Sequence, residues 1–300
     1  MPDPVEIFDR RAVRRNRDRA APLLEHHDFL LREVAERLAD RLLDVRRRFP
    51  VALDLGCHAG EIADTLGDRG GVETLVQCDL SEAMIRRAGG LRAVADEEFL
   101  PFAPASFDLV ISNLSLHWVN DLPGTLHQIR SILKPDGLFL GAMLGGQTLK
   151  ELRRAWLEAE IAEEGGAGPR VSPFADVRDA GALLQRAGFA LPVVDADTIA
   201  VTYGDAMRLM ADLRGMGESN AVRQRRKTFT RRQTLLRAVS LYQELYANGD
   251  GRLPAAFQVV TMTGWAPHPS QPRPLRPGTG TVDLADALDF PHDEKPPRLP

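Results

Sequence analysis

The stretch VALDLGCHAG, residues 51–60, decides the fold. It begins with a continuous apolar run, which is typical of a strand that is buried on both faces of a parallel sheet. The run ends in a turn of small residues, and a helical pattern follows over residues 61–66. The two glycines, Gly56 and Gly60, let the backbone approach a ligand closely, and the helix that follows offers free N–H groups. We therefore expect a strand, a ligand-binding loop and a helix.

Short apolar runs and helical patterns continue to alternate on both sides of this loop. An amphipathic helix is predicted first, over residues 23–45, because leucines and valines recur there at steps of three and four. The alternation that follows predicts an α/β fold, a doubly wound, Rossmann-like sheet of parallel strands with helices between them. The predicted strands are 51–55, 74–78, 91–95, 107–113 and 138–143, and the predicted helices are 61–66, 81–88, 122–133 and 149–162.

The C-terminal half contains fewer signals. A helix is predicted at 176–187, and extended segments at 191–203 and 256–265 are separated by an interval with helical periodicity. The nine prolines after residue 265 disfavour packed helices and central strands there. We therefore expect an N-terminal helical cap (1–49), a cofactor-binding domain (50–203), a helical insertion or lid (204–252), a final strand (253–268) and a mostly disordered tail (269–300).

Composition excludes several classes of protein. With 44% hydrophobic and 27% charged residues the chain is globular, and no uncharged apolar stretch reaches the roughly 20 residues of a membrane span. A net charge of -4 argues against a nucleic-acid-binding protein. Two cysteines, Cys57 and Cys78, are too few for a disulfide framework or a zinc site, and we expect both to be buried. Neither a signal peptide nor a transit peptide is recognisable, which predicts a cytoplasmic protein.

Polar residues stand at the ends of the predicted strands. Asp79 ends the second strand, where a carboxylate can accept both hydroxyl hydrogens of a ribose. Asp96 and Glu97 follow the third strand and are placed to meet an adenine amino group. Asn113 ends the fourth strand, at the edge where ligands of open parallel sheets collect. Together with the glycine loop, these residues predict a cofactor that contains adenosine.

Residues 50–143 resemble the class I S-adenosylmethionine-dependent methyltransferases. The resemblance is carried by VALDLGCHAG, CDLSEAM, ADEEFLPFAPASFDLVISN and LKPDG. It implies S-adenosylmethionine as the cofactor. His58 stands where many members have a second glycine, so its side chain would crowd the methionine moiety or bond its carboxylate. The implied roles are Asp54 facing the methionine amino group, Asp79 holding the ribose, Leu80 and Met84 flanking the adenine, and Asp96 bonding its amino group.

A finer resemblance covers nearly the whole chain. IFDR at 7–10, SLHWVNDLP at 115–123, GMGESN at 215–220 and GWAPHPSQPRP at 264–274 are similar to blocks of the complex I assembly factor 5 family. This resemblance implies hydroxylation of an arginine on the quinone-module iron–sulfur subunit of NADH dehydrogenase, which would be the protein partner.

Four residues are candidates for the chemistry on the substrate. His117 and Trp118 follow the fourth strand, where this fold usually places substrate contacts, although they would serve equally as a packing pair. Asp121 and Glu218 are acids that can be brought near the cleft, where a carboxylate would grip a guanidinium through paired hydrogen bonds. The seven histidines offer no short two-histidine motif beside an acid, so we expect no metal site.

Two basic stretches of the sequence allow less specific predictions. The arginines between residues 10 and 19 are expected to form a solvated helix face. The block from 223 to 237 contains basic residues and no acid, and would be either a plain surface or a site for an acidic partner.

Three functions are consistent with the sequence. The first is an enzyme that hydroxylates a protein arginine during assembly of respiratory complex I. The second is a methyltransferase for a small molecule or an acyl-carrier thioester, like the malonyl-carrier enzyme of the biotin pathway. The third is a non-catalytic assembly chaperone that keeps a cofactor pocket for stability.

Overall fold

The structure is a computed structural model that describes residues 6–174 and 177–272. The chain divides into a large unit that ends at Pro267 and a second unit from His268 onward. In the second unit, residues 268–272 form a turn in which the backbone N–H of Gln271 donates to the carbonyl of His268. Most of the predicted tail (269–300), the end of the GWAPHPSQPRP block and the first residue of the helix predicted at 176–187 lie outside the described residues.

The large unit is built on one sheet, whose described strands run in the order β3-β2-β1-β4-β5-β7-β6. The first five are parallel, as predicted from the continuous apolar runs. β7 runs antiparallel to both of its neighbours, so the sheet is mixed rather than wholly parallel. The strands are β1 (Val51–Leu55), β2 (Thr74–Asp79), β3 (Leu91–Val94), β4 (Phe107–Asn113), β5 (Leu133–Leu144), β6 (Ala190–Tyr203) and β7 (Leu253–Trp265).

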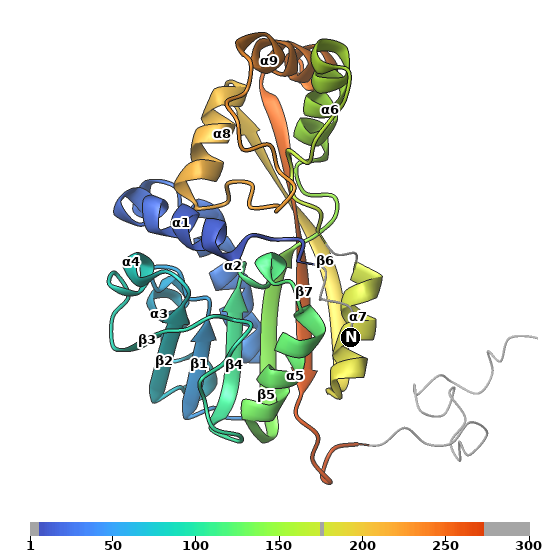
Figure 1. The fold of residues 1–300 in the computed structure, drawn as a ribbon. Helices are drawn as coiled ribbons and strands as arrows, with labels where there is room; N and C mark the ends of the chain where they lie inside the picture. The colour runs from blue at the N-terminus through green and yellow to red at the C-terminus, as the bar shows by residue number, and fades with distance from the viewer. Residues whose placement is uncertain (1–5, 175–176, 273–300) are drawn as a thin grey trace, which may run out of the picture. The chain divides into compact units, whose positions relative to one another are not determined.

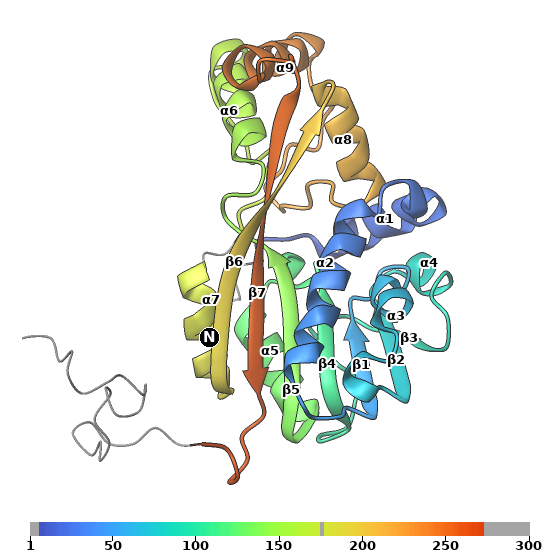
Figure 2. The same cartoon turned by 180° about the vertical axis from the view of Figure 1, so that it is seen from behind.

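Helices cover both faces of the sheet. α2 and α3 lie on one face, and α5 and α7 lie on the other (Figures 1 and 2). No helix among the described residues has the length and apolar character that crossing a membrane requires. The α-helices are α1 (Arg10–Ala20), α2 (Phe29–Asp40), α3 (Glu61–Leu66), α4 (Glu82–Ile85), α5 (Leu122–Ile132), α6 (Lys150–Glu164), α7 (Val177–Ala187), α8 (Ala206–Gly215) and α9 (Arg232–Tyr246). The 3-10 helices are η1 (Ala21–His26), η2 (Arg41–Asp44), η3 (Arg69–Gly71) and η4 (Leu116–Trp118).

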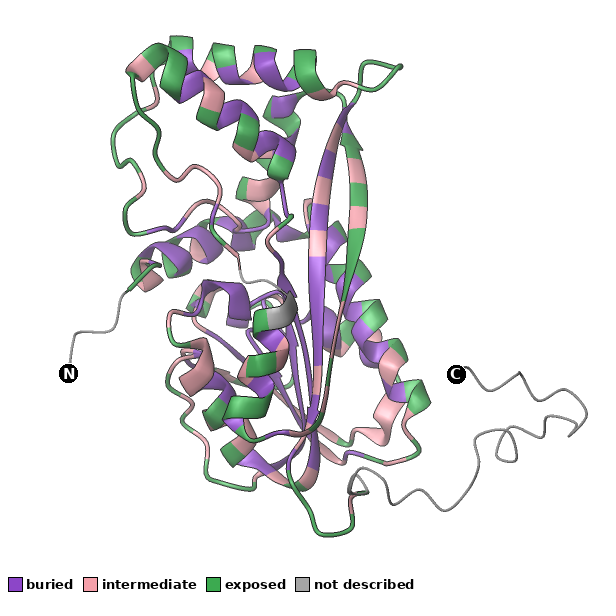
Figure 3. Cartoon of the chain, turned by 90° about the vertical axis from the view of Figure 1, so that its right-hand side faces the viewer, coloured by how far each residue is buried: buried purple, intermediate pink, exposed green. Residues whose placement is uncertain are grey.

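The strands alternate between two hydrophobic layers. Ala52 and Ile111 belong to the layer that includes α2, whereas Leu53, Val110 and Phe139 belong to the layer that includes α5 and α7. All five side chains are fully buried, and the burial of the central strands is visible in Figure 3. Because both faces of the sheet are covered by apolar layers, the sequences of these strands are continuously apolar and do not alternate between apolar and polar residues.

The N-terminal region differs from the prediction of one helix over residues 23–45. The chain forms η1, α2 and η2 there, and a turn at His27 separates the first two. The reason is local, since the backbone of His27 leaves the helical region (φ -132, ψ 1) and Asp28 starts a new helix. α1 precedes this region and contacts both α4 and α8.

β6 and β7 extend beyond the rest of the sheet as a two-stranded ribbon. The pairing of β5 with β7 ends at Val259, whereas β6 and β7 stay paired as far as Tyr203 and Leu253. α6, α8 and α9 gather around this extension (Figure 1), and Leu209 and Tyr242 from α8 and α9 are fully buried. The helical insertion between the last two strands is therefore present, and it shares a core with the ribbon.

Candidate active site

The glycine loop between β1 and α3 adopts a backbone that glycine favours. Gly56 has a φ of +71°, and its N–H donates to the carbonyl of Cys78 at 2.8 Å. A Cβ on Gly56 would lie 2.1 Å from Oγ of Ser115, so the loop has no room for a side chain there. His58 also has a positive φ, +50°, which explains why a glycine suits this position in related loops. The neighbouring Cys57 is free and buried, as predicted.

A Gly56→Ala variant tests this packing. The added methyl group must displace Ser115. We expect this clash to lower the free energy of unfolding by about 1–3 kcal/mol, in addition to the cost of placing an alanine in a left-handed backbone. Gly90→Ala is the matched control, because Gly90 has a φ of +63° and no neighbour within 4 Å of its Cβ position. Urea denaturation of both variants measures the difference, and equal losses of stability would show that the loop is not tightly packed.

Two buried acids flank the glycine loop with incomplete hydrogen bonding. Both carboxylate oxygens of Asp54 lack a hydrogen-bond partner among the described residues, and so does Oε2 of Glu61. Burial is the largest cause of the raised pKa of each group, and it raises the pKa of Glu61 to about 7. An unpaired buried carboxylate is costly, so Asp54 is stabilised either by a proton or by a cationic group of a ligand.

The raised pKa of Glu61 predicts a dependence of stability on pH. Between its usual pKa of 4.5 and about 7, the folded protein holds a proton that the unfolded chain has lost. The free energy of unfolding therefore falls as the pH rises through this window, by about 1–3 kcal/mol. A Glu61→Gln variant should lose this component, whereas the exposed Glu73→Gln should keep it. Denaturation series at pH 5 and pH 8 check the sign, and identical pH profiles for wild type and Glu61→Gln would contradict it.

Arg17 of α1 binds the acids at the carboxyl ends of β2 and β3. Its Nη1 donates to Oδ2 of Asp79 at 3.0 Å and to Oε1 of Glu97 at 2.9 Å, and its Nη2 donates to Oγ of Ser115 at 2.9 Å. Arg17 is 1% exposed, and both carboxylates are fully buried. Burial alone would lower the pKa of Arg17, but Asp79 and Glu97 outweigh it and raise that pKa.

Arg10 completes this charge network. It forms ion pairs with Glu97 and with Asp96, and it donates to the carbonyl of Trp118. Burial would raise the pKa of Glu97, but Arg10 and Arg17 hold it well below its usual value. The prediction that the arginines of this helix form a solvated face is therefore wrong for these two, because they neutralise buried acids.

The other predicted cofactor residues lie around the same edge. Asp96 pairs with Arg10, and Leu80 packs against the hydrophobic cluster that contains Trp118. Met84 is fully buried in the core, and Asn113 donates from Nδ2 to the carbonyl of Leu31. His58 turns its ring inward, with Nε2 3.1 Å from the carbonyl oxygen of Asn113. Their roles toward a cofactor stay predictions.

His117, Trp118 and Glu218 form a second cluster. Nε2 of His117 lies 3.0 Å from Oε2 of Glu218, and Nε1 of Trp118 donates to the same carboxylate at 3.1 Å. The backbone N–H of Leu144 points at Nδ1 of His117, which leaves Nε2 of the ring to donate to Glu218. Burial would raise the pKa of Glu218, but the interactions with His117 and Trp118 lower it. Glu218 is therefore an ionised carboxylate with a fixed orientation.

Asp121 does not join this cluster. Its Oδ1 accepts a hydrogen bond from the backbone N–H of Gly124 at 2.9 Å, and it caps the N-terminus of α5. The prediction that Asp121 faces the substrate is not supported, because its exposed side chain satisfies the first turn of a helix instead.

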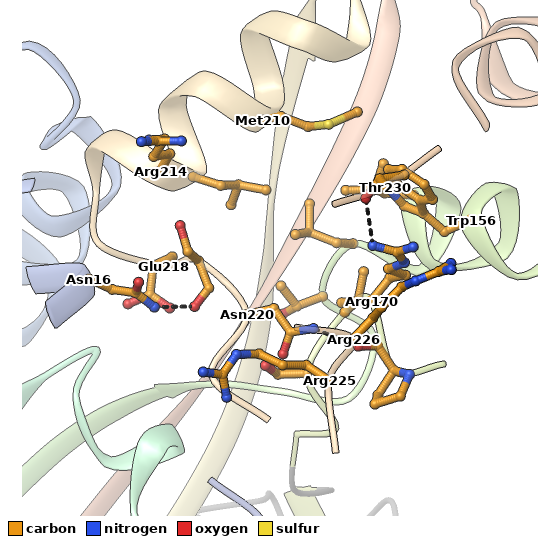
Figure 4. A pocket seen from close by; sticks show the side chains of 18 of the residues that line it. Asn16, Trp156, Arg170, Met210, Arg214, Glu218, Asn220, Arg225, Arg226 and Thr230 are labelled. Atoms are coloured by element: carbon orange, nitrogen blue, oxygen red, sulfur yellow. Dashed lines mark hydrogen bonds between the residues drawn. The ribbon is translucent and has the colours of Figure 1, made fainter. Parts of the chain in front are cut away.

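A cavity of about 660 Å³ opens beside Glu218. Trp118, Trp156 and Phe174 contribute aromatic walls, and Met210 of α8 closes part of it. Figure 4 shows Asn16, Glu218 and Arg214 on one side of the cavity and Trp156, Arg170 and Thr230 on the other. Among the described lining residues, Glu218 is the only acid. Six basic side chains also line the cavity, so Glu218 is the one described position on its wall where a cationic side chain would find a counter-ion.

Three residues of this region were missed by the sequence analysis, namely Arg10, Arg17 and Ser115. Arg10 and Arg17 are seven positions apart, which places them on the same face of a helix, and this spacing is the signal that could have identified them. Ser115 carries no comparable signal, because it becomes important only through contacts with Arg17 and Glu97.

The residues present fit a cationic adenosine cofactor such as S-adenosylmethionine. Both oxygens of the buried Asp54 carboxylate lack a hydrogen-bond partner among the described residues, which suits the cationic ammonium group of such a cofactor. Asp79 and Glu97 are already neutralised by Arg17, so a ribose would have to replace one of its hydrogen bonds. Within the described ranges, no group of three or more His, Cys, Asp or Glu side chains is placed to hold a metal ion.

Comparison with known proteins places this geometry in a family. Residues 53–141 match the family described as "Methyltransferase domain". The fold is similar to that of the YcgJ protein of Bacillus subtilis, with a TM-score of 0.55 and 14% identity over 77% of this chain and 98% of that one.

Two curated proteins are similar over most of their length. The chain is 37% identical to the malonyl-[acyl-carrier protein] O-methyltransferase of Halorhodospira halophila, over 88% of this chain and 90% of the relative. It is 47% identical to the mitochondrial arginine-hydroxylase NDUFAF5 of Danio rerio, over 94% of this chain and 89% of the relative. The chain therefore belongs to the NDUFAF5 arginine-hydroxylase family of methyltransferase-fold enzymes.

Proposed function

We propose that this protein binds S-adenosylmethionine at the glycine loop and hydroxylates an arginine of a protein partner that enters the adjacent cavity. The observation that carries the proposal is the ionised carboxylate of Glu218, held by His117 and Trp118 at the cavity wall. The expected partner is the quinone-module iron–sulfur subunit of NADH dehydrogenase, modified in the cytoplasm during assembly of complex I.

The chain supplies binding and orientation. Gly56, Gly60 and Asp79 would hold the cofactor, with Asp54 opposite its ammonium group. The cofactor carries a methyl group activated by a sulfonium, which would be transferred only in the methyl-transfer alternative, because hydroxylation does not consume it. Glu218 would accept paired hydrogen bonds from the guanidinium, and His117 and Trp118 would keep that carboxylate in one orientation. Hydroxylation inserts one oxygen atom into a C–H bond of the arginine, which is a two-electron oxidation. The step balances with a peroxide as the co-substrate, which would give up one oxygen atom and be reduced to water or an alcohol.

The electrostatics favour hydroxylation over methyl transfer to the guanidinium. Methylating a guanidinium requires removal of a proton, and this needs a base. Glu218 has a lowered pKa and accepts hydrogen bonds already, so it is a weak base and a good counter-ion. Asp121, the second acid considered for this task, caps α5. A clamp that leaves the guanidinium charged suits attack on a carbon atom of the side chain.

Methyl transfer to an acyl-carrier thioester is the alternative that the Halorhodospira halophila relative suggests. A malonyl group carries a carboxylate, which Glu218 would repel. The basic side chains that line the same cavity would attract that carboxylate, so the charge of the cavity does not decide between the two substrates. The higher identity to the arginine-hydroxylase of Danio rerio, 47% against 37%, favours the arginine substrate.

We further propose that residues 204–252 form a lid that selects the substrate. Arg214 of α8 and the segment from Glu218 to Thr230 line the cavity, which supports this role. Because Leu209 and Tyr242 are fully buried, deleting the insertion would expose the core of the ribbon. Point variants at the cavity are therefore the better test.

The reaction can be read directly from the natural partner. The gene would be deleted in the source organism and the arginine-bearing peptide of the iron–sulfur subunit weighed by mass spectrometry, with complementation by wild type and by Glu218→Gln. Loss of one oxygen that only the wild type restores supports the proposal. Loss of one methylene would assign methyl transfer instead, and an unchanged mass would favour the non-catalytic chaperone.

A further inference from the structure

The rim of the cavity carries more positive charge than its own acids neutralise. Six basic side chains line the cavity, and three of them are compensated within the chain. The compensated three are Arg170 with Glu160, Arg225 with Asp9, and Arg226 with Glu164.

The other three are Arg19, Arg214 and Lys227, and we call them the basic rim. In the part of the chain that the structure describes, none of them forms an ion pair, and all three are exposed. They come from α1, from α8 and from the segment after Val222, so they surround the opening instead of following one helix. Burial lowers the pKa of Arg19, and repulsion from Arg214, which lines the same cavity, lowers it further.

A cavity with an acid on its wall and cations at its opening favours a ligand that carries both positive and negative charge. A lone arginine would be attracted by Glu218 but repelled by the basic rim. A polypeptide that carries carboxylates on either side of its arginine satisfies both. Asn16 and Ser219 fix the position of this opening, because Asn16 donates to the carbonyl of Ser219 and Arg19 donates to its hydroxyl.

We propose that the basic rim binds acidic side chains flanking the target arginine, so that the enzyme selects an arginine in an acidic sequence context. This inference rests on the proposed function, because it takes Glu218 as the site of the guanidinium. It assigns Arg19, Arg214 and Lys227 to partner recognition and gives them no part in the chemistry.

Binding of three synthetic peptides to the full-length protein tests the proposal. Each has one central arginine, and its flanks carry glutamate, glutamine or lysine. At low salt we expect the glutamate peptide to bind about tenfold more tightly than the glutamine peptide, since exposed ion pairs are weak singly and combine here. The lysine peptide should bind most weakly, and the differences should shrink at high salt. Equal affinities for the three peptides at low salt would overturn the proposal, as would tighter binding of a single-stranded RNA of the same net charge.

Charge reversal gives the matched variants. Arg19→Glu/Arg214→Glu should prefer the lysine peptide, and the milder Arg19→Gln/Arg214→Gln should abolish the preference. Arg11→Glu/Arg208→Glu changes two exposed arginines on the same two helices that do not line the cavity, and it should keep the wild-type preference. Unchanged preference in the reversed variant, with a normal thermal melt, would contradict the role of the rim.

The guanidinium site at Glu218 and the acidic preference of the basic rim can be tested independently of each other. A glutamate-flanked peptide whose central arginine is replaced by glutamine measures the contribution of the guanidinium alone. If that peptide binds as tightly as the arginine peptide, the clamp at Glu218 is wrong while the acidic preference stands. If the central arginine contributes and the flanks do not, the rim is wrong and the proposed function stands.

Discussion

Replacing Glu218 with glutamine is expected to lower the affinity for an arginine peptide by about 100-fold or more, and to lower the fraction of modified arginine accordingly. Glutamine keeps the size of the side chain and one acceptor for His117 and Trp118, so the cluster can stay packed. What it loses is the charge opposite the guanidinium, and an unpaired cation in a buried cavity is strongly disfavoured. The fraction of modified arginine peptide after complementation, and peptide affinity in titration calorimetry, measure the effect.

The control variant for this experiment is Glu163→Gln, an exposed acid near the end of α6. It should behave as wild type in both measurements. Affinity for S-adenosylmethionine should be nearly unchanged in Glu218→Gln, because the carboxylate belongs to the substrate cavity and not to the glycine loop. Normal modification by Glu218→Gln would remove the central residue of the proposed function.

The parallel part of the sheet was predictable because burial on both faces leaves a local signature. β1 and β4 each contain a continuous apolar run, at residues 51–53 and 109–111, which the two hydrophobic layers bury on both faces. The antiparallel placement of β7 carries no such signature, since about 50 residues separate it from β6 and direction is set by where the insertion returns. The break at His27 was missed because the apolar periodicity continues across it.

The sequence was sufficient to predict those site residues that stand directly at the carboxyl end of a strand. The carboxyl ends of parallel strands share an edge, so Asp79 and the glycine loop had to meet. Arg17 was misread because its partners are distant in sequence, and an arginine on an amphipathic helix is usually solvated. Asp121 was misread for the opposite reason. Its side chain caps the N-terminus of α5, and this local hydrogen bond takes the place of the predicted contact with a substrate.

An Asp79→Asn variant and an Arg17→Met variant should change the affinity for S-adenosylmethionine in opposite directions. Asp79 is held by the backbone N–H groups of His58 and Ser81, so its carboxylate is fixed where a ribose would bind. Loss of its charge should weaken cofactor binding by tenfold or more, as expected for a buried charge-assisted hydrogen bond.

Arg17→Met should strengthen cofactor binding by a similar factor while lowering the stability of the free protein. Arg17 occupies Oδ2 of Asp79 in the structure and neutralises Glu97, so a ribose has to displace it. Without Arg17 the buried carboxylates repel each other, and a cationic cofactor then relieves that repulsion on binding. Titration calorimetry gives the two affinities, and thermal melts with and without cofactor separate affinity from folding. Arg11→Met, at an exposed arginine on the same helix, is the matched control. Weaker binding by Arg17→Met would mean that this arginine holds the cofactor instead of competing with it.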